Sequence, residues 1–346
     1  MIHKTLLHIM TILFALLLPS TGIAKIAGYN VIFIHGFIPY DPIIGDREEH
    51  VLKRRILDFA APFWVENHTE GFLNWSAADR IEDGIAKLVV KQAKQYSANG
   101  LCHDGCVLVT HSTGDLVARY FLANQKEWLE KDGYEPLKII ATIDFGGAGG
   151  GTDIADKLVN VVDSDYFPLP LKLALGAILG LDRDIFDYQD LGALLDLQKS
   201  KARSIANWPN DIPRLRFSGS GKVLGGRLIK MLIPGADDGV VPAHSSCGAA
   251  SADPIDSCSN YIGYDGKQGK VKGPSKLLYN HFPVLMSDNY GHLQMTGYKN
   301  RGQATAVLND FYAGLKVDFE THTKNKTRGW FRWRKKDTYQ FVKGSN

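Results

Sequence analysis

The chain has 346 residues, 45% of them apolar, and a formal net charge of +3 at pH 7. This length allows a full hydrophobic core, built as one large α/β domain or as one domain with an inserted cap. The charge is uneven: residues 323–346 hold eight Lys and Arg against one acid, so the rest of the chain is mildly acidic. A mildly acidic body without a nucleic-acid-binding motif argues against a nucleic-acid partner.

The first 24 residues have the pattern of a secretory signal peptide. A basic start at residues 1–4 precedes an apolar stretch at residues 5–18 and a small-residue ending at Ala24. The stretch is short for a membrane span, so we expect cleavage after Ala24 and export to the periplasm or the medium. An uncleaved anchor is the alternative.

Strands and helices are expected to alternate through residues 25–322, which we take as one domain. Val31–Ile34 and Lys138–Asp144 are apolar runs typical of buried strands, and residues 80–98 have the apolar spacing of a helix. Residues 302–316 read as a closing helix. This alternation predicts an α/β fold with a mainly parallel central sheet and helices on both faces.

The most informative segment is Val107–Tyr120, where an apolar strand pattern runs directly into a helical one. Ser112 lies at the junction, two residues after Thr110 and two before Gly114. This placement matches the nucleophile elbow G-x-S-x-G, with Thr110 in place of the first glycine. The elbow needs small residues at both positions because their side chains approach closely across the turn, a requirement that Gly114 meets.

Two segments after the elbow have compositions that need an interpretation. The glycine run 146–151 lacks the Gly-Lys-Ser/Thr ending of a phosphate-binding loop, so we interpret it as a turn beside the site. Residues 153–206 change to a helical pattern and predict a cap insertion. Its apolar stretch 171–181 could line an acyl pocket, and a plain buried helix pair is the alternative.

A serine nucleophile needs a base within hydrogen-bond reach and an acid that orients the base. Asp238 follows an apolar strand-like segment and precedes a turn glycine, with Asp237 as the substitute. His292 follows a glycine in a polar loop near the end of the domain, and His281 is the competitor. The order Ser112, Asp238, His292 is the order of an α/β-hydrolase triad.

The oxyanion of an acyl-transfer intermediate needs two backbone donors. The amide of Thr113 follows the nucleophile at a helix N-terminus, and the amide of Phe37 follows the first strand within His35-Gly36-Phe37. We expect both amides to form the oxyanion hole. His35 and His111 are then expected to support the site rather than to carry protons.

Four cysteines fit an oxidising compartment. The two local pairs, Cys102 with Cys106 and Cys247 with Cys258, are the simplest of the three pairings. A zinc site that uses His103 is a weaker alternative, because no tetrahedral set of ligands is spaced around it. In the tail, Trp330 and Trp333 alternate with Arg332 and Arg334, a composition that suits an anionic membrane surface. A solvated tail, or a short terminal strand with packed aromatics, is the alternative.

The chain resembles the secreted bacterial triacylglycerol lipases of the α/β-hydrolase fold. The resemblance rests on Val31–Phe37, the elbow, Gly151–Asp156 and Asp238–Val241, and it runs from about residue 31 to 316. It departs at Thr110, at the glycine run, which lacks a Thr-Pro-His, and in the cysteines. The resemblance implies a structural calcium near the histidine loop; Asp288 could be one ligand, without a convincing second carboxylate.

These observations predict an exported serine hydrolase that cleaves carboxylic esters, lipid esters in particular, without a cofactor. An acyltransferase, amidase or thioesterase of the same fold would use the same triad. A non-catalytic homologue that binds lipid or a partner is a further alternative, from a different class.

Overall fold

The computed structural model describes nine segments of the chain. They are residues 28–37, 69–162, 192–205, 212–219, 232–252, 281–285, 291–292, 307–310 and 315–318. The predicted signal peptide (residues 1–24), the apolar stretch 171–181 of the predicted cap and the basic tail (residues 323–346) lie outside them.

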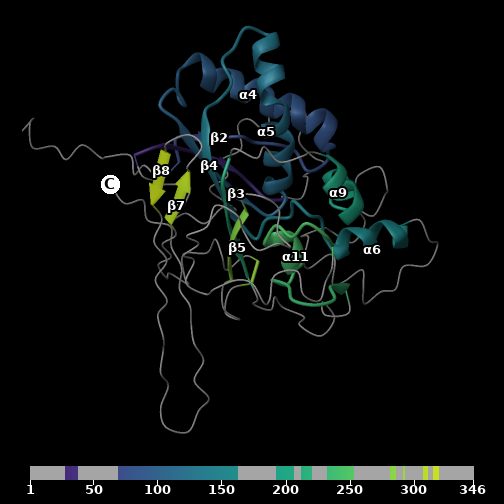
Figure 1. Cartoon of the computed structure of the whole chain (residues 1–346). Coiled ribbons are helices and arrows are strands. Elements are labelled where there is room, and N and C mark those ends of the chain that lie inside the picture. The colour runs from purple at the N-terminus through teal and green to yellow at the C-terminus, as the bar shows by residue number, and fades with distance from the viewer. Residues whose placement is uncertain are drawn as a thin grey trace, which may run out of the picture.

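A six-stranded sheet forms the centre of the molecule (Figure 1). Its strands are β1 (Asn30–Ile34), β2 (Gly71–Phe72), β3 (Cys106–His111), β4 (Ile139–Phe145), β5 (Arg214–Ser218) and β6 (His281–Leu285). They lie in the order β2-β1-β3-β4-β5-β6, and each neighbouring pair is parallel. The carboxyl ends of all six strands therefore meet at one edge, where parallel α/β sheets place their sites.

The strand that carries the predicted nucleophile lies inside this sheet. β3 pairs with β1 on one side, from Asn30↔Cys106 to Ile34↔Thr110, and with β4 on the other. Its residues Val107, Leu108 and Val109 are at most 1% exposed. Both faces of β3 are thus covered, which explains why its sequence is continuously apolar instead of alternating.

Helices precede and follow β3. The π-helical turn η2 (Ile81–Ile85) continues into α4 (Ala86–Ala98), and α5 (Gly114–Lys131) follows the elbow. The two long helices α4 and α5 pack against each other beside the sheet (Figure 1). The predicted helix over residues 80–98 is confirmed, and the helix predicted after the elbow is α5, which continues past Tyr120 to Lys131.

The helical segment between β4 and β5 is confirmed where it is described. It contains α6 (Asp153–Val162), α8 (Ala193–Asp196) and α9 (Lys199–Ile205). Lys199 forms ion pairs with Asp153 and Asp156, and buried Asp196 pairs with Arg80 and accepts the backbone N–H of Ile81 at 2.8 Å. The Lys199 ion pairs join the two ends of the insertion to each other, and the Asp196 contacts fix its second end to Arg80 and Ile81 at the start of η2.

The described architecture is that of an α/β-hydrolase fold, as the sequence predicted.

A short helix, α11 (Ala243–Ser246), follows the loop that carries Asp238. Within the described residues, no helix is both long and apolar enough to cross a bilayer.

The closing helix predicted over residues 302–316 is wrong. β7 (Val307–Asp310) and β8 (Leu315–Asp318) form a two-stranded antiparallel sheet there, with Val307 opposite Asp318. Each strand is a four-residue piece, and so short an apolar pattern does not separate helix from strand. The sequence has a glycine at position 314, just before β8, and glycine disfavours a helix interior, a signal that the helical interpretation did not use.

The two cysteines before β3 form a disulfide, as predicted, with Cys102 bonded to Cys106. Their sulfurs are therefore not thiolate ligands, and the alternative of a zinc site at His103 is wrong. Cys247 is also in a disulfide, whose second sulfur lies outside the described residues.

Candidate active site

Ser112 occupies the turn between β3 and α5. Its φ of 55° is in the left-handed region, and no other non-glycine residue of the described segments has a positive φ. This conformation costs an L-residue about 1–2 kcal/mol, so it persists only where the surroundings impose it. Ser112 N–H donates to the Phe145 carbonyl at 3.0 Å, and its carbonyl accepts the N–H of Ala148 at 2.9 Å.

The elbow lies in close contact with the end of β1. A Cβ atom on Gly114 would lie 2.5 Å from the carbonyl oxygens of Ile34 and His35, which excludes any side chain there. A Cβ atom on Gly36 would lie 2.8 Å from Cβ of Ser112. The backbone of the His35-Gly36-Phe37 segment therefore runs directly against the serine.

Thr110, the departure from the usual elbow, has a partner of its own. Its hydroxyl donates to Oδ1 of Asp144 on β4 at 2.6 Å, and the side chain is fully buried. Thr110 and Asp144 are register partners in the sheet, so the threonine needs no distortion to make this bond. A hydroxyl at this position satisfies a buried carboxylate, which a glycine could not do.

That carboxylate belongs to a buried ionic cluster, which we define as Asp115, Asp144, Arg119, Arg214 and Arg216. Its members are at most 7% exposed. Asp115, in the first turn of α5, is bonded to both Arg214 and Arg216, the latter at 2.7 Å. Arg214 Nε donates to Asp144 at 3.0 Å. The cluster joins the start of α5 to β4 and β5, directly beneath the elbow.

Asp115 is held in its ionised form by this cluster. Burial opposes ionisation, but the guanidinium groups of Arg214 and Arg216 outweigh it and hold the pKa of Asp115 well below its usual range. For Arg119, burial together with the positive charge of Arg214 lowers the pKa to about 10. Both groups thus stay charged at neutral pH inside the core.

The glycine run 146–151 closes over the ionic cluster. Gly149 N–H donates to Asp115 Oδ2 at 2.7 Å, and its carbonyl accepts a bond from Arg119. Cβ atoms on Gly147 and Gly149 would lie 2.5 and 2.6 Å from Asp115 Oδ2. The run is the turn beside the site that the sequence predicted. The carboxylate against it also makes it unsuited to a phosphate.

Asp238 and His292 are joined across 54 residues of sequence. Nδ1 of His292 lies 2.8 Å from Oδ2 of Asp238, and the His292 N–H donates to the Asp238 carbonyl at 2.8 Å. The other carboxylate oxygen of Asp238 accepts the N–H groups of Val240 and Val241, at 3.0 and 2.7 Å. The carboxylate is therefore fixed, fully buried, and oriented towards the imidazole.

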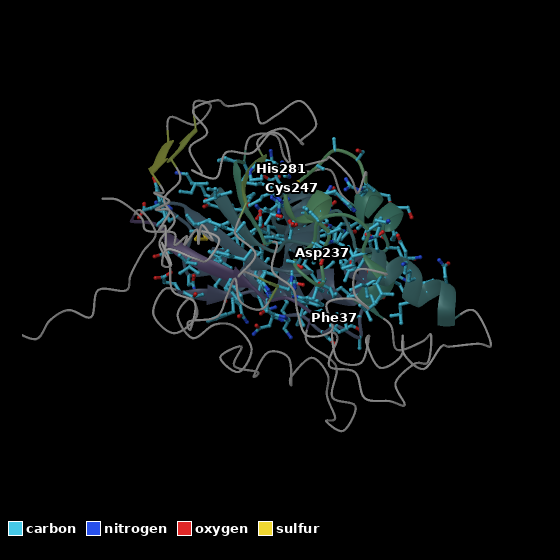
Figure 2. All side chains as sticks on the ribbon, turned by 90° about the horizontal axis from the view of Figure 1, so that it is seen from below. Phe37, Asp237, Cys247 and His281 are labelled. Atoms are coloured by element: carbon cyan, nitrogen blue, oxygen red, sulfur yellow. A yellow bond between two sulfur atoms is a disulfide. The ribbon has the colours of Figure 1, made fainter. Side chains whose placement is uncertain are left out.

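The two substitute residues are engaged elsewhere. Asp237 Oδ1 accepts the Gly239 N–H at 2.8 Å and so stabilises the turn. His281 lies on β6, where it is 1% exposed and packs against Gly248, beside Cys247 (Figure 2). Figure 2 also shows His281 well away from Phe37. Neither residue takes part in a carboxylate–imidazole contact like the one between Asp238 and His292.

His111 connects the imidazole to the elbow. It directly precedes Ser112, its Nε2–H donates to the His292 carbonyl at 3.1 Å, and the two rings lie 4.7 Å apart. Burial and the neighbouring His292 lower the pKa of His111 to about 3, so its ring stays neutral. Among the described groups, the Ser112 hydroxyl and the His292 ring are not hydrogen-bonded to each other. Such bonds are often long before substrate binds.

The two predicted oxyanion donors flank the serine. Thr113 follows Ser112 at the N-terminus of α5, and Phe37 follows Gly36, whose backbone contacts Ser112. Within the described segments, neither amide donates to another backbone or side-chain group. Two N–H groups thus have no acceptor among the described groups, one on the residue after Ser112 and one on the residue after Gly36.

The described residues contain no group of three His, Cys, Asp or Glu side chains that could hold a metal ion. Asp288, the residue considered for calcium, lies outside them.

The ionic cluster was not predicted from the sequence. Arg214 and Arg216 alternate with Leu215 and Phe217 on β5, a pattern usually interpreted as one polar and one apolar face. The signal in the sequence was Asp115, a carboxylate three residues after Ser112, in a helix turn that must face the sheet. Two buried arginines require such partners.

No protein-family model matches the sequence, and no curated protein matches it. Solved structures do resemble this chain. A Bacillus licheniformis lipase, BlEst2 in mature form, is 16% identical with a TM-score of 0.46, covering 78% of this chain and 88% of that one. Staphylococcus hyicus lipase is 14% identical (TM-score 0.42; 78% and 89% covered). Lipase 1 from Pelosinus fermentans is 15% identical (TM-score 0.44; 79% and 94% covered).

Proposed function

We propose that the protein is an exported serine hydrolase that cleaves carboxylic esters, lipid esters in particular. The observation that carries the proposal is the 2.8 Å contact between His292 Nδ1 and Asp238 Oδ2 at the edge of the sheet where Ser112 holds a left-handed turn. A fixed acid–base pair and a strained serine at one sheet edge are the elements of acyl transfer. The names of the structural neighbours, which include lipases and a carboxyl esterase, agree with this chemistry.

In this mechanism Ser112 Oγ attacks the acyl carbon while His292 Nε2 takes the hydroxyl proton. Asp238 holds the imidazole with Nδ1–H towards its carboxylate and stabilises the imidazolium that forms. The amides of Thr113 and Phe37 donate to the oxyanion of the tetrahedral intermediate. His292 then returns the proton to the leaving alcohol, and water repeats the sequence on the acyl-enzyme.

Transfer to an alcohol, amine or thiol acceptor would use the same groups, so an acyltransferase, amidase or thioesterase remains the alternative within this fold. Product analysis with and without an added alcohol acceptor separates transfer from hydrolysis. A non-catalytic binding protein is the alternative from another class, and it predicts no reaction with a fluorophosphonate.

The test is hydrolysis of a p-nitrophenyl ester series from acetate to palmitate, with Ser112→Ala alongside. Long-chain activity that is lost in the variant supports a lipase, whereas activity confined to short chains supports an esterase. Fluorophosphonate labelling is measured in parallel. No turnover together with no labelling of Ser112 would refute the enzyme and favour the binding protein.

Export and membrane contact complete the proposal and rest on sequence alone. We infer that residues 1–24 direct export and that Trp330, Trp333, Arg332 and Arg334 bring the enzyme to an anionic lipid surface. Sedimentation with vesicles in which about one fifth of the lipid is anionic tests the membrane contact. Binding should weaken with salt and fall when the two arginines are replaced by glutamine, while ester turnover in solution stays unchanged.

A further inference from the structure

His35 contacts the loop that bears the predicted oxyanion donor. It lies at the end of β1, is 5% exposed, and its Nδ1 lies 2.7 Å from the carbonyl oxygen of Gly36. A carbonyl oxygen only accepts, so Nδ1 carries the proton of this bond. The imidazole thus holds the Gly36–Phe37 peptide by its oxygen.

Trp75 fixes which ring nitrogen of His35 is protonated. The Trp75 backbone N–H donates to Nε2 at 3.2 Å, which requires that nitrogen to be unprotonated and leaves the proton on Nδ1. The Trp75 indole stacks on the imidazole with 4.9 Å between ring centroids and an interplanar angle of 3°, and its Nε1–H donates to the His35 carbonyl at 3.1 Å. The ring is held in position, orientation and tautomer.

In a peptide group, the direction of the C=O fixes the direction of the N–H. In a planar trans peptide the C=O and the next residue's N–H point in opposite directions. No described peptide bond is cis. The bond from His35 to the Gly36 oxygen therefore sets the direction of the Phe37 N–H, in a segment that lies against the Ser112 side chain.

We propose that His35 is a positioning residue of the oxyanion hole, which directs the Phe37 N–H to the developing oxyanion through the Gly36 carbonyl. This proposal rests on the proposed function, since it assumes that Ser112 forms a tetrahedral intermediate. His35 neither touches substrate nor transfers a proton in this scheme. Its effect belongs to the transition state, because the Phe37 amide is used fully only when charge develops on the oxygen.

Three substitutions separate positioning from packing. His35→Phe keeps an aromatic ring that can stack on Trp75 and removes the ring bonds to Gly36 and Trp75, whereas His35→Asn keeps a donor close to the Nδ1 position. Gln92→Met is the matched control, since Gln92 is 4% exposed and bonds both backbone groups of Asn74, the residue before Trp75, without contacting Gly36. This control removes buried hydrogen bonds from the same segment.

The measurements are kcat per fluorophosphonate-titrated site, KM, the melting temperature and the inhibition constant of a trifluoromethyl ketone. That ketone forms a tetrahedral oxyanion on the serine. Loss of one oxyanion donor lowers kcat about 10²–10³-fold, and misdirecting a donor should lower kcat by a smaller factor. We expect His35→Phe to lower kcat about 10–100-fold with KM within about threefold. The inhibition constant of the ketone should rise by a similar factor. His35→Asn should recover most of the kcat and of the ketone affinity that His35→Phe loses.

Gln92→Met should lower the melting temperature and leave kcat per titrated site unchanged. The proposal is overturned if His35→Phe keeps its kcat per titrated site, or if it loses only stability, as Gln92→Met does. It is also overturned if turnover falls while ketone binding is unchanged. Failure of the proposed function gives a different result, because the unmodified protein would then neither turn over esters nor react with the fluorophosphonate, and both proposals would fall.

Discussion

Asp115→Asn tests whether the buried ionic cluster stabilises the fold as a set of charges. The substitution keeps the size of the side chain and one acceptor oxygen, but it removes the charge that faces Arg214 and Arg216. Asp115, Arg214 and Arg216 are at most 1% exposed, so solvent cannot replace the lost partner. Breaking a buried pair from one side costs about 3–5 kcal/mol, a large part of the 5–15 kcal/mol that stabilises a typical domain.

The assay is urea denaturation at pH 7 with the disulfides intact, followed by far-UV circular dichroism. With a slope of about 3 kcal/mol per molar urea, the midpoint should fall by about 1–1.7 M. Asp83→Asn is the control, since Asp83 pairs with Lys87 on the surface with 71% of its side chain exposed. Its midpoint should not move measurably. If Asp115→Asn behaves like the control, the cluster does not act through its charges and the reasoning is refuted.

Three further predictions concern the site. Asp238→Asn should lower kcat about 10⁴-fold by favouring the wrong imidazole tautomer, and Asp237→Asn should stay within about threefold; equal losses in ester turnover would contradict the assignment. Because burial holds the pKa of His111 at about 3, against 6.5 in the unfolded chain, unfolding takes up a proton and stability falls as the pH drops below 6.5. Between pH 7 and pH 5, the unfolding free energy of His111→Gln should fall by up to about 1–2 kcal/mol less than that of the unmodified protein. The same fall in both proteins would refute this. Thr110→Gly restores the usual elbow residue but removes a donor from Asp144, so it should cost about 1–3 kcal/mol in urea denaturation; a stabilised variant would show that the bond contributes nothing.

The sequence predicted the parallel sheet and the elbow because both depend on local patterns. A continuous apolar run such as Val31–Ile34 indicates a strand covered on both faces, and a serine between such a run and a helix indicates a sharp turn. The loops that carry Asp238 and His292 were found by their order after Ser112. These inferences needed no knowledge of distant contacts.

What the sequence could not predict depends on pairing across the sheet. The roles of Arg214 and Arg216 follow only from the register that places β5 beside β4, with Asp144 opposite Arg216. Thr110 looked like a flaw in the elbow until its register partner was known. The closing hairpin of β7 and β8 was missed because four-residue strands carry too little periodicity.

The contact between His111 and His292 spans 181 residues of chain. Contacts at such separation form late in folding, because the entropy of closing a long loop is lost before the contact is gained. A partly folded chain can therefore hold the elbow before His292, the proposed base, is in place. Appearance of fluorophosphonate reactivity during refolding would then report the final docking step. If the chain crosses a membrane unfolded, as we propose, the proposed triad would assemble only on the other side.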